Sequence, residues 1–128
     1  MIPHGWTADT SPDHVELNEI LKKVAKKVHE THGETYKFGP MSTTIYPCSG
    51  SSPDWAYTKA SIKYSFIVEL RDKGENGFLL PRDYILPTAQ ETFEGIKTLV
   101  EQVVLDDKEN LTVPRKCVAC ERNFTSES

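Results

Sequence analysis

Residues 61–80, SIKYSFIVELRDKGENGFLL, carry the strongest strand pattern in the chain. Alternate positions in the first half are apolar, and Ile67 makes the opposite face partly apolar too. Strands that are apolar on both faces are typical of α/β sheets, which are covered on both sides. We predict a buried central strand whose first face holds Ile62, Tyr64, Phe66, Val68 and Leu70.

A helix is predicted to begin at Ser11-Pro12-Asp13, since serine is a good N-cap and proline suits the first helical position. It is expected to run to about Thr31, with Gly33 ending it. Its inward face would be Leu17, Ile20, Leu21, Val24 and Val28. The lysines at 22, 23, 26 and 27 are interpreted as its solvated face.

A second long helix is predicted from Thr88, because Thr88 and Glu91 have the spacing of a capping box. It would continue to about Leu105, and residues 106–128 are expected to form a polar, poorly ordered tail. Its predicted inward residues are Phe93, Ile96, Leu99, Val100 and Val103. A short helix is expected from Ser52 through Tyr57.

The predicted sheet is incomplete. A doubly covered strand needs neighbours on both edges, because unpaired buried N–H and C=O groups are costly. The other strand candidates are short, namely residues 42–46 and 78–80. The sequence therefore indicates part of a larger α/β domain.

Composition narrows the function classes. The chain has 128 residues, 38% of them hydrophobic, and a formal net charge of −4. An acidic balance argues against a nucleic-acid partner. There is no apolar run of transmembrane length and no signal-peptide pattern at the N-terminus, so neither a membrane nor a signal sequence is expected in this chain.

Glu69 stands at the end of the predicted strand, and ligands of α/β sheets bind beyond the carboxyl ends of strands. A partly desolvated carboxylate there is suited to act as a general base. The structural alternative is an ion pair with Arg71, two residues on and on the same face. The pattern alone favours the ion pair.

Three blocks resemble consecutive segments of the zinc metallocarboxypeptidases of the pancreatic A/B type. They are TTIYPCSGSSPDWAY, IKYSFIVELRDKGENGFLLP and ILPTAQETFEGIKTLVEQVV, and IPHGWTADTSPDHVELNEILKKV resembles the preceding block. The resemblance covers about residues 2–105 and represents the last third of that family's catalytic domain. It implies the C-terminal portion of a mixed-sheet α/β fold and the removal of C-terminal residues from peptides.

The resemblance assigns roles residue by residue. Glu69 matches the catalytic general base, which deprotonates zinc-bound water. Tyr46 matches a mobile tyrosine over the substrate's carboxylate, Phe78 an aromatic at the substrate entrance, and Arg71 a structural arginine. The bonds Pro3–His4 and Arg71–Asp72 would be cis.

Pro53 aligns with the residue that sets substrate preference, where B-type enzymes carry aspartate. A neutral proline implies an A-like preference for apolar or aromatic terminal residues. Met41, Ile45, Cys48 and Ile67 fall near the same pocket and agree with that preference. Proline departs from the A-type aliphatic residue, and Ala60-Ser61 adds one residue before the strand.

The family's zinc ligands include an HxxE motif, and none occurs here. The four histidines, at positions 4, 14, 29 and 32, are followed three residues on by Thr7, Leu17, His32 and Thr35. The family uses zinc, yet no metal is expected to bind this chain, which is expected to be inactive alone. Peptide C-termini would be partners if a zinc-binding part is present, and the family implies secretion. The alternative is a non-catalytic remnant that binds peptides or proteins.

Remaining motifs are weaker. His29 and His32 are three apart, and we interpret them as a solvated helix end rather than a metal site. Cys117 and Cys120 form a CxxC without further ligands, which favours a disulfide or free thiols over zinc or redox chemistry. Asn110 and Asn123 begin glycosylation sequons.

Overall fold

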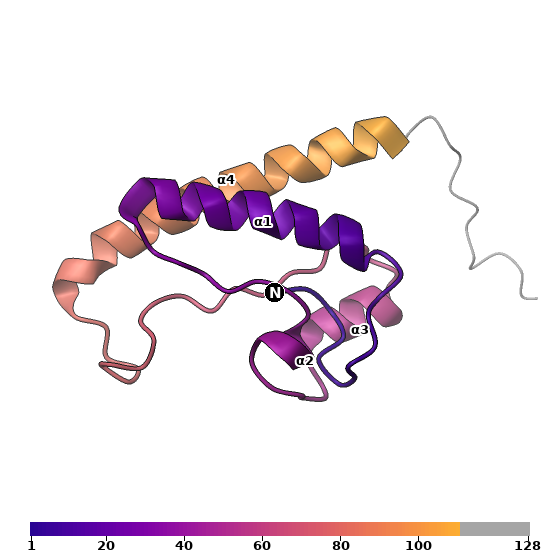
Figure 1. The fold of residues 1–128 in the computed structure, drawn as a ribbon, viewed down its shortest axis with the longest axis horizontal. Coiled ribbons are helices and arrows are strands. Elements are labelled where there is room, and N and C mark those ends of the chain that lie inside the picture. Colours follow the sequence, from indigo (N-terminus) through magenta and orange to yellow (C-terminus); the bar gives the residue numbers. More distant parts are fainter. Residues whose placement is uncertain (111–128) are drawn as a thin grey trace, which may run out of the picture.

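The computed structural model describes residues 1–110. Two long helices, α1 (His14–His32) and α4 (Ile85–Asn110), lie side by side. Two short helices, α2 (Met41–Thr44) and α3 (Ser52–Thr58), group below them, and a 3₁₀ turn, η1 (Arg82–Tyr84), leads into α4. Figure 1 shows this arrangement, with the N-terminal segment between the helix pair and the short helices.

Helix α1 confirms the predicted inward face and the predicted end. Leu17, Ile20, Leu21 and Val28 are buried, and Gly33 caps the helix in the left-handed conformation at φ 78°. The predicted start is wrong by two residues, because residues 11–13 first form a turn in which the Ser11 carbonyl accepts from the His14 amide. Ser11 is therefore not the N-cap.

Helix α4 begins at Ile85, so the predicted capping box at Thr88 is wrong. Pro87 is tolerated in the first turn, where its missing N–H would have no helical partner. The Thr88 hydroxyl instead donates back to the Tyr84 carbonyl at 2.6 Å. At its other end the helix includes residues 106–110, which were predicted to belong to the tail. The rest of that tail lies outside the described residues.

The two long helices meet on the small-residue face of α4, not on the predicted apolar one. Gly95 is buried, and a Cβ built on it would lie 2.9 Å from Val28 Cγ2. Phe93, Ile96 and Val100, predicted to point inward, are all more than half exposed. Glycine thus sets the distance between α1 and α4, while the apolar stripe of α4 stays uncovered within residues 1–110.

No strand forms in residues 1–110, which corrects the predicted sheet. Of the predicted short strand at 42–46, residues 42–44 instead lie in helix α2. Residues 61–70 run without a ladder. Within the described chain, their one reciprocal backbone pair joins Ile67 and Met1, at 3.1 Å and 2.7 Å.

The N-terminal segment holds the centre together. Ile2 forms an isolated parallel bridge with Pro40, donating to the Gly39 carbonyl at 3.0 Å and accepting from the Met41 amide at 3.1 Å. It packs with Leu17 and Leu21 in the small core, against which three aromatic rings lie half-buried. These rings belong to Tyr57, Tyr64 and Phe66.

Backbone details test two further expectations. The Arg71–Asp72 bond is cis as expected, whereas Pro3–His4 is not. Ser61, beside the added residue before the strand, adopts a positive φ of 56°. None of the helices in residues 1–110 is long and apolar enough to cross a membrane.

The Gly95 contact gives a testable prediction. Gly95→Ala should destabilise the protein by about 1–3 kcal/mol, because the new methyl overpacks the stiff Val28 side chain. In a Val28→Ala background the same change should be neutral or stabilising by up to about 1 kcal/mol, since alanine favours helix more than glycine. Urea unfolding of the four variants measures this coupling. Equal effects in both backgrounds would contradict it.

Candidate functional site

A cleft of about 490 Å³ opens between α1, α4 and the two extended segments 34–38 and 66–73. Its lining brings together three of the predicted site residues, Glu69, Ile67 and Ile45. Apolar side chains of both long helices form much of the remaining wall, including Leu21, Val24, Val28, Ile96 and Leu99. The lining also contains the carboxylates of Glu34 and Asp72, so Glu69 is one of three acidic residues around a largely apolar hollow.

Glu69 is exposed and has no side-chain hydrogen bond or ion pair within residues 1–110. The favoured structural alternative, an ion pair with Arg71, is therefore wrong in this part of the chain. Arg71 points to other carboxylates instead. The charge of Glu69 acts on the Met1 amino group: burial lowers the pKa of that amine to about 6, and the Glu69 carboxylate opposes the shift.

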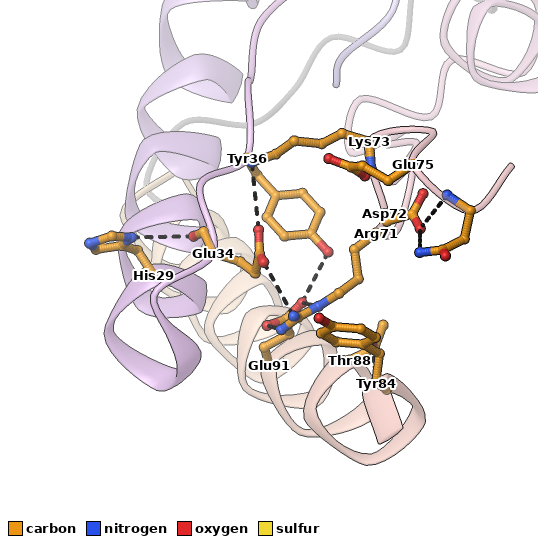
Figure 2. A network of polar contacts seen from close by, with 11 residues as sticks. His29, Glu34, Tyr36, Arg71, Asp72, Lys73, Glu75, Tyr84, Thr88 and Glu91 are labelled. Carbon is orange, nitrogen blue, oxygen red and sulfur yellow. Dashed lines mark hydrogen bonds and ion pairs between the residues drawn. The ribbon is translucent and has the colours of Figure 1, made fainter. Parts of the chain in front are cut away.

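Arg71 is the centre of a polar network drawn in Figure 2. Its Nε donates to Glu91 Oε1 at 2.9 Å, and its Nη2 contacts Glu91 Oε2. Its Nη1 donates to Glu34 Oε1 at 3.2 Å, and the Tyr36 hydroxyl donates to Glu91 Oε1 at 3.2 Å. The network joins α4, the segment after α1 and the end of residues 61–71.

Burial makes this network strongly interdependent. The Glu91 side chain is 0% exposed and that of Arg71 10% exposed. Hydrogen bonding to Glu91 raises the pKa of Arg71. Burial, followed by the charge of Glu91, raises the pKa of Tyr36, so its hydroxyl stays a donor. A buried pair of this kind leaves a costly lone charge when one member is removed.

The other predicted binding residues lie apart from the cleft. Tyr46 is 64% exposed, Phe78 is fully exposed, and Pro53 is buried in the first turn of α3. Of the additional pocket candidates, Met41 and Cys48 do not line the cleft either. The structure thus brings Ile45, Ile67 and Glu69 together but not Tyr46, Pro53 or Phe78.

Asp54, next to Pro53, is a structural residue that the sequence interpretation missed. Its buried carboxylate accepts the His4 amide at 2.7 Å and the Gly5 amide at 3.0 and 3.1 Å. A Cβ on Gly5 would lie 2.3 Å from Met41 Cε and 3.2 Å from the Cys48 carbonyl oxygen, so a side chain there would displace Met41. The first turn of helix α3 therefore fixes the backbone around His4 and Gly5 through Asp54.

Glu91 is the second missed residue, because its spacing from Thr88 suggested a helix cap. The available signal was the face it shares with Thr88 and Gly95, a polar and small-residue stripe at helical spacing. A carboxylate in a stripe that contacts another helix needs a cationic partner. Arg71 is that partner.

The remaining motifs show no site. His29 Nδ1 contacts the Glu34 carbonyl at 3.3 Å, and His32 Nε2 contacts Gln90 Oε1 at 2.9 Å, so each histidine has its own partner. Among residues 1–110 no cluster of three metal-ligating side chains occurs. Cys117, Cys120 and the sequon at Asn123 lie outside the described residues.

Comparisons with known proteins agree on one family. A sequence profile described as zinc carboxypeptidase matches residues 1–95. The chain is a member of the zinc carboxypeptidase family. It is 48% identical to carboxypeptidase A4 of Mus musculus over 103 residues, which are 80% of this chain and 24% of that protein.

Both subtypes are similar to this zinc carboxypeptidase chain. Carboxypeptidase A1 and carboxypeptidase B of Bos taurus are each 46% identical over 104 residues, 81% of this chain and 25% of theirs. The structure of bovine thrombin-activatable fibrinolysis inhibitor in complex with tick carboxypeptidase inhibitor superposes with a TM-score of 0.78 at 37% identity. It covers 82% of this chain and 36% of that one.

The chain spans about a quarter of the length of the curated relatives it matches. The likeness to solved structures supports the carboxypeptidase fold for this portion. The sheet expected from that fold does not form within residues 1–110. Residues 61–70 therefore run without a ladder, because a strand needs neighbours to complete its hydrogen bonds.

The buried pair gives a prediction with a matched control. Glu91→Gln should lower the free energy of unfolding by about 3–5 kcal/mol, because Arg71 keeps its charge in a buried site. Glu19→Gln breaks the exposed Glu19–Lys22 pair and should cost less than about 0.5 kcal/mol. Chemical denaturation of both variants checks the contrast, and similar losses would show that burial is not the cause.

Proposed function

We propose that this chain supplies the base and the apolar part of the substrate pocket of a zinc carboxypeptidase site. Glu69 would activate a zinc-bound water, and Ile45 and Ile67 would contact an apolar terminal side chain. The observation that carries the proposal is that these three residues line one cleft. Tyr46 and Phe78, both exposed, would close over a peptide that enters from outside.

The zinc would come from another part of the protein. No HxxE motif occurs in the sequence, and the chain spans a quarter of its relatives' length. We infer that the chain alone does not hydrolyse peptides, because a carboxylate base needs a water whose pKa a metal has lowered. Peptide C-termini would be the substrates, and secretion would follow from the family.

An A-like preference is the finer proposal. Ile45 and Ile67 present hydrocarbon to the cleft, and transfer of an aromatic or branched side chain onto such a surface is favourable. Relatives of both the A and the B type match equally well, so identity does not decide between them. The chemistry of the pocket wall supports apolar terminal residues.

A hybrid enzyme tests this proposal. The full 128-residue chain would replace the matching segment of bovine carboxypeptidase A1. The hybrid should release a terminal Phe in a zinc-dependent reaction and prefer Phe over Lys. Glu69→Gln should lower kcat at least a hundredfold, because general-base catalysis contributes about 10²–10⁴-fold. The purified chain with added zinc should release none.

Controls separate folding from chemistry. Val15→Gln changes an exposed side chain at the start of α1 and should leave kcat unchanged. A folded hybrid that binds zinc yet shows no release, or one unaffected by Glu69→Gln, would refute the assignment of the base.

The second candidate function is peptide binding without catalysis. It is favoured by which residues form the walls of the cleft. All of them belong to this chain, so a peptide could bind without the zinc-binding part. The isolated chain should then bind a peptide ending in Phe but not one ending in Lys, measured by calorimetry. Equal absence of binding for both peptides would count against this function.

A further inference from the structure

The segment that carries Glu69 has few attachments of its own. Val68, Glu69 and Leu70 are all exposed, and none of the three makes a backbone–backbone hydrogen bond within residues 1–110. Arg71 is the next side chain that is largely buried. The position of Glu69 therefore depends on Ile67 on one side and Arg71 on the other.

The loop after Arg71 does not supply an anchor. Asp72 caps its own turn, accepting the Gly74 amide at 2.8 Å and the Asn76 amide at 3.1 Å. Residues 73–79 are exposed. Their hydrogen bonds are local and fix the shape of the loop. The Lys73–Glu34 ion pair, at 3.8 Å, joins the loop to the segment after α1, but the Lys73 side chain is 70% exposed, so this pair holds the loop only weakly.

Arg71 itself is held from two directions. The carboxylate of Glu91 on α4 accepts from Nε and contacts Nη2. The carboxylate of Glu34, after α1, accepts from Nη1. The ring of Tyr84 lies 5.8 Å from the guanidinium carbon. A planar guanidinium with two donors on one carboxylate has a defined direction as well as a defined place. Figure 2 shows the side chain reaching from its segment into this group.

Glu69 and Arg71 are two residues apart, about 7 Å along an extended backbone, so a displacement of Arg71 also moves the backbone that carries Glu69. We propose that Glu91 is a positioning residue for Glu69, acting through Arg71 to hold the base at the rim of the cleft. This rests on the proposed function of Glu69 as the base. A misplacement of about 1 Å can cost about a hundredfold in rate.

The test must separate positioning from stability. Glu91→Gln alone cannot do this, because it weakens both the positioning of Arg71 and the stability of the protein. The double variant Arg71→Met, Glu91→Leu replaces a buried ion pair by apolar side chains of similar length, which commonly keeps or raises stability. The double variant also removes the two directed contacts between the guanidinium and the Glu91 carboxylate. Its matched control is Lys22→Met, Glu19→Leu on the exposed pair of α1.

Kinetics in the hybrid enzyme give the first readout, taken below the melting temperature of every variant. Glu91→Gln and the Arg71, Glu91 double variant should each lower kcat about 10–100-fold, with KM for the Phe peptide within about twofold. The double variant should nevertheless melt within a few degrees of the parent. The exposed-pair control should match the parent in both.

Amide relaxation in the full chain gives the second readout and needs no activity. The order parameter of the Glu69 amide should fall from about 0.85 to below about 0.6 in both Glu91 variants, while Ala25 in α1 stays near 0.85. If the double variant restores melting temperature, kcat and Glu69 order together, the pair is only structural and the proposal is overturned. If the parent hybrid is inactive but Glu69 order still falls, the proposed function fails and the positioning stands.

Discussion

The ion pair between Arg71 and Glu91 is the interaction on which the described structure most depends. It joins the last long helix to the end of the segment that carries Glu69, and Glu34 and Tyr36 tie the segment after α1 to the same group. Both charges are removed from water, so neither partner is stable without the other. One guanidinium therefore joins helix α4, the segment after α1 and the end of residues 61–71.

The sequence predicted the helices more reliably than the sheet. Helix α1 follows its pattern because the inward residues from Leu17 to Val28 meet their partners inside the described chain, and Gly33 ends it for a local reason. The strand pattern at 61–70 is equally clear, but a strand depends on distant neighbours. Met1 is the main one available, so the run stays extended without a ladder.

Helix α4 shows why amphipathicity alone was misleading. Its widest apolar stripe, with Phe93, Ile96 and Val100, is exposed, while the stripe with Glu91 and Gly95 packs against α1. A pattern identifies which faces are apolar but not which of two faces finds a partner. The structure places Glu69, Ile45 and Ile67 in the lining of one cleft, and the roles that the family resemblance gives them stay predictions. Glu91 was missed because its role depends on a residue twenty positions away.

The pairing of Met1 with Ile67 also has a consequence for the order in which the molecule assembles. These partners are 66 positions apart, and Tyr36 is 55 positions from Glu91. Contacts of such separation are slow to form, because long loops must close before any contact compensates. During synthesis, helix α1 can form early, yet the cleft cannot close until α4 has left the ribosome. Until then its apolar walls are open to other chains.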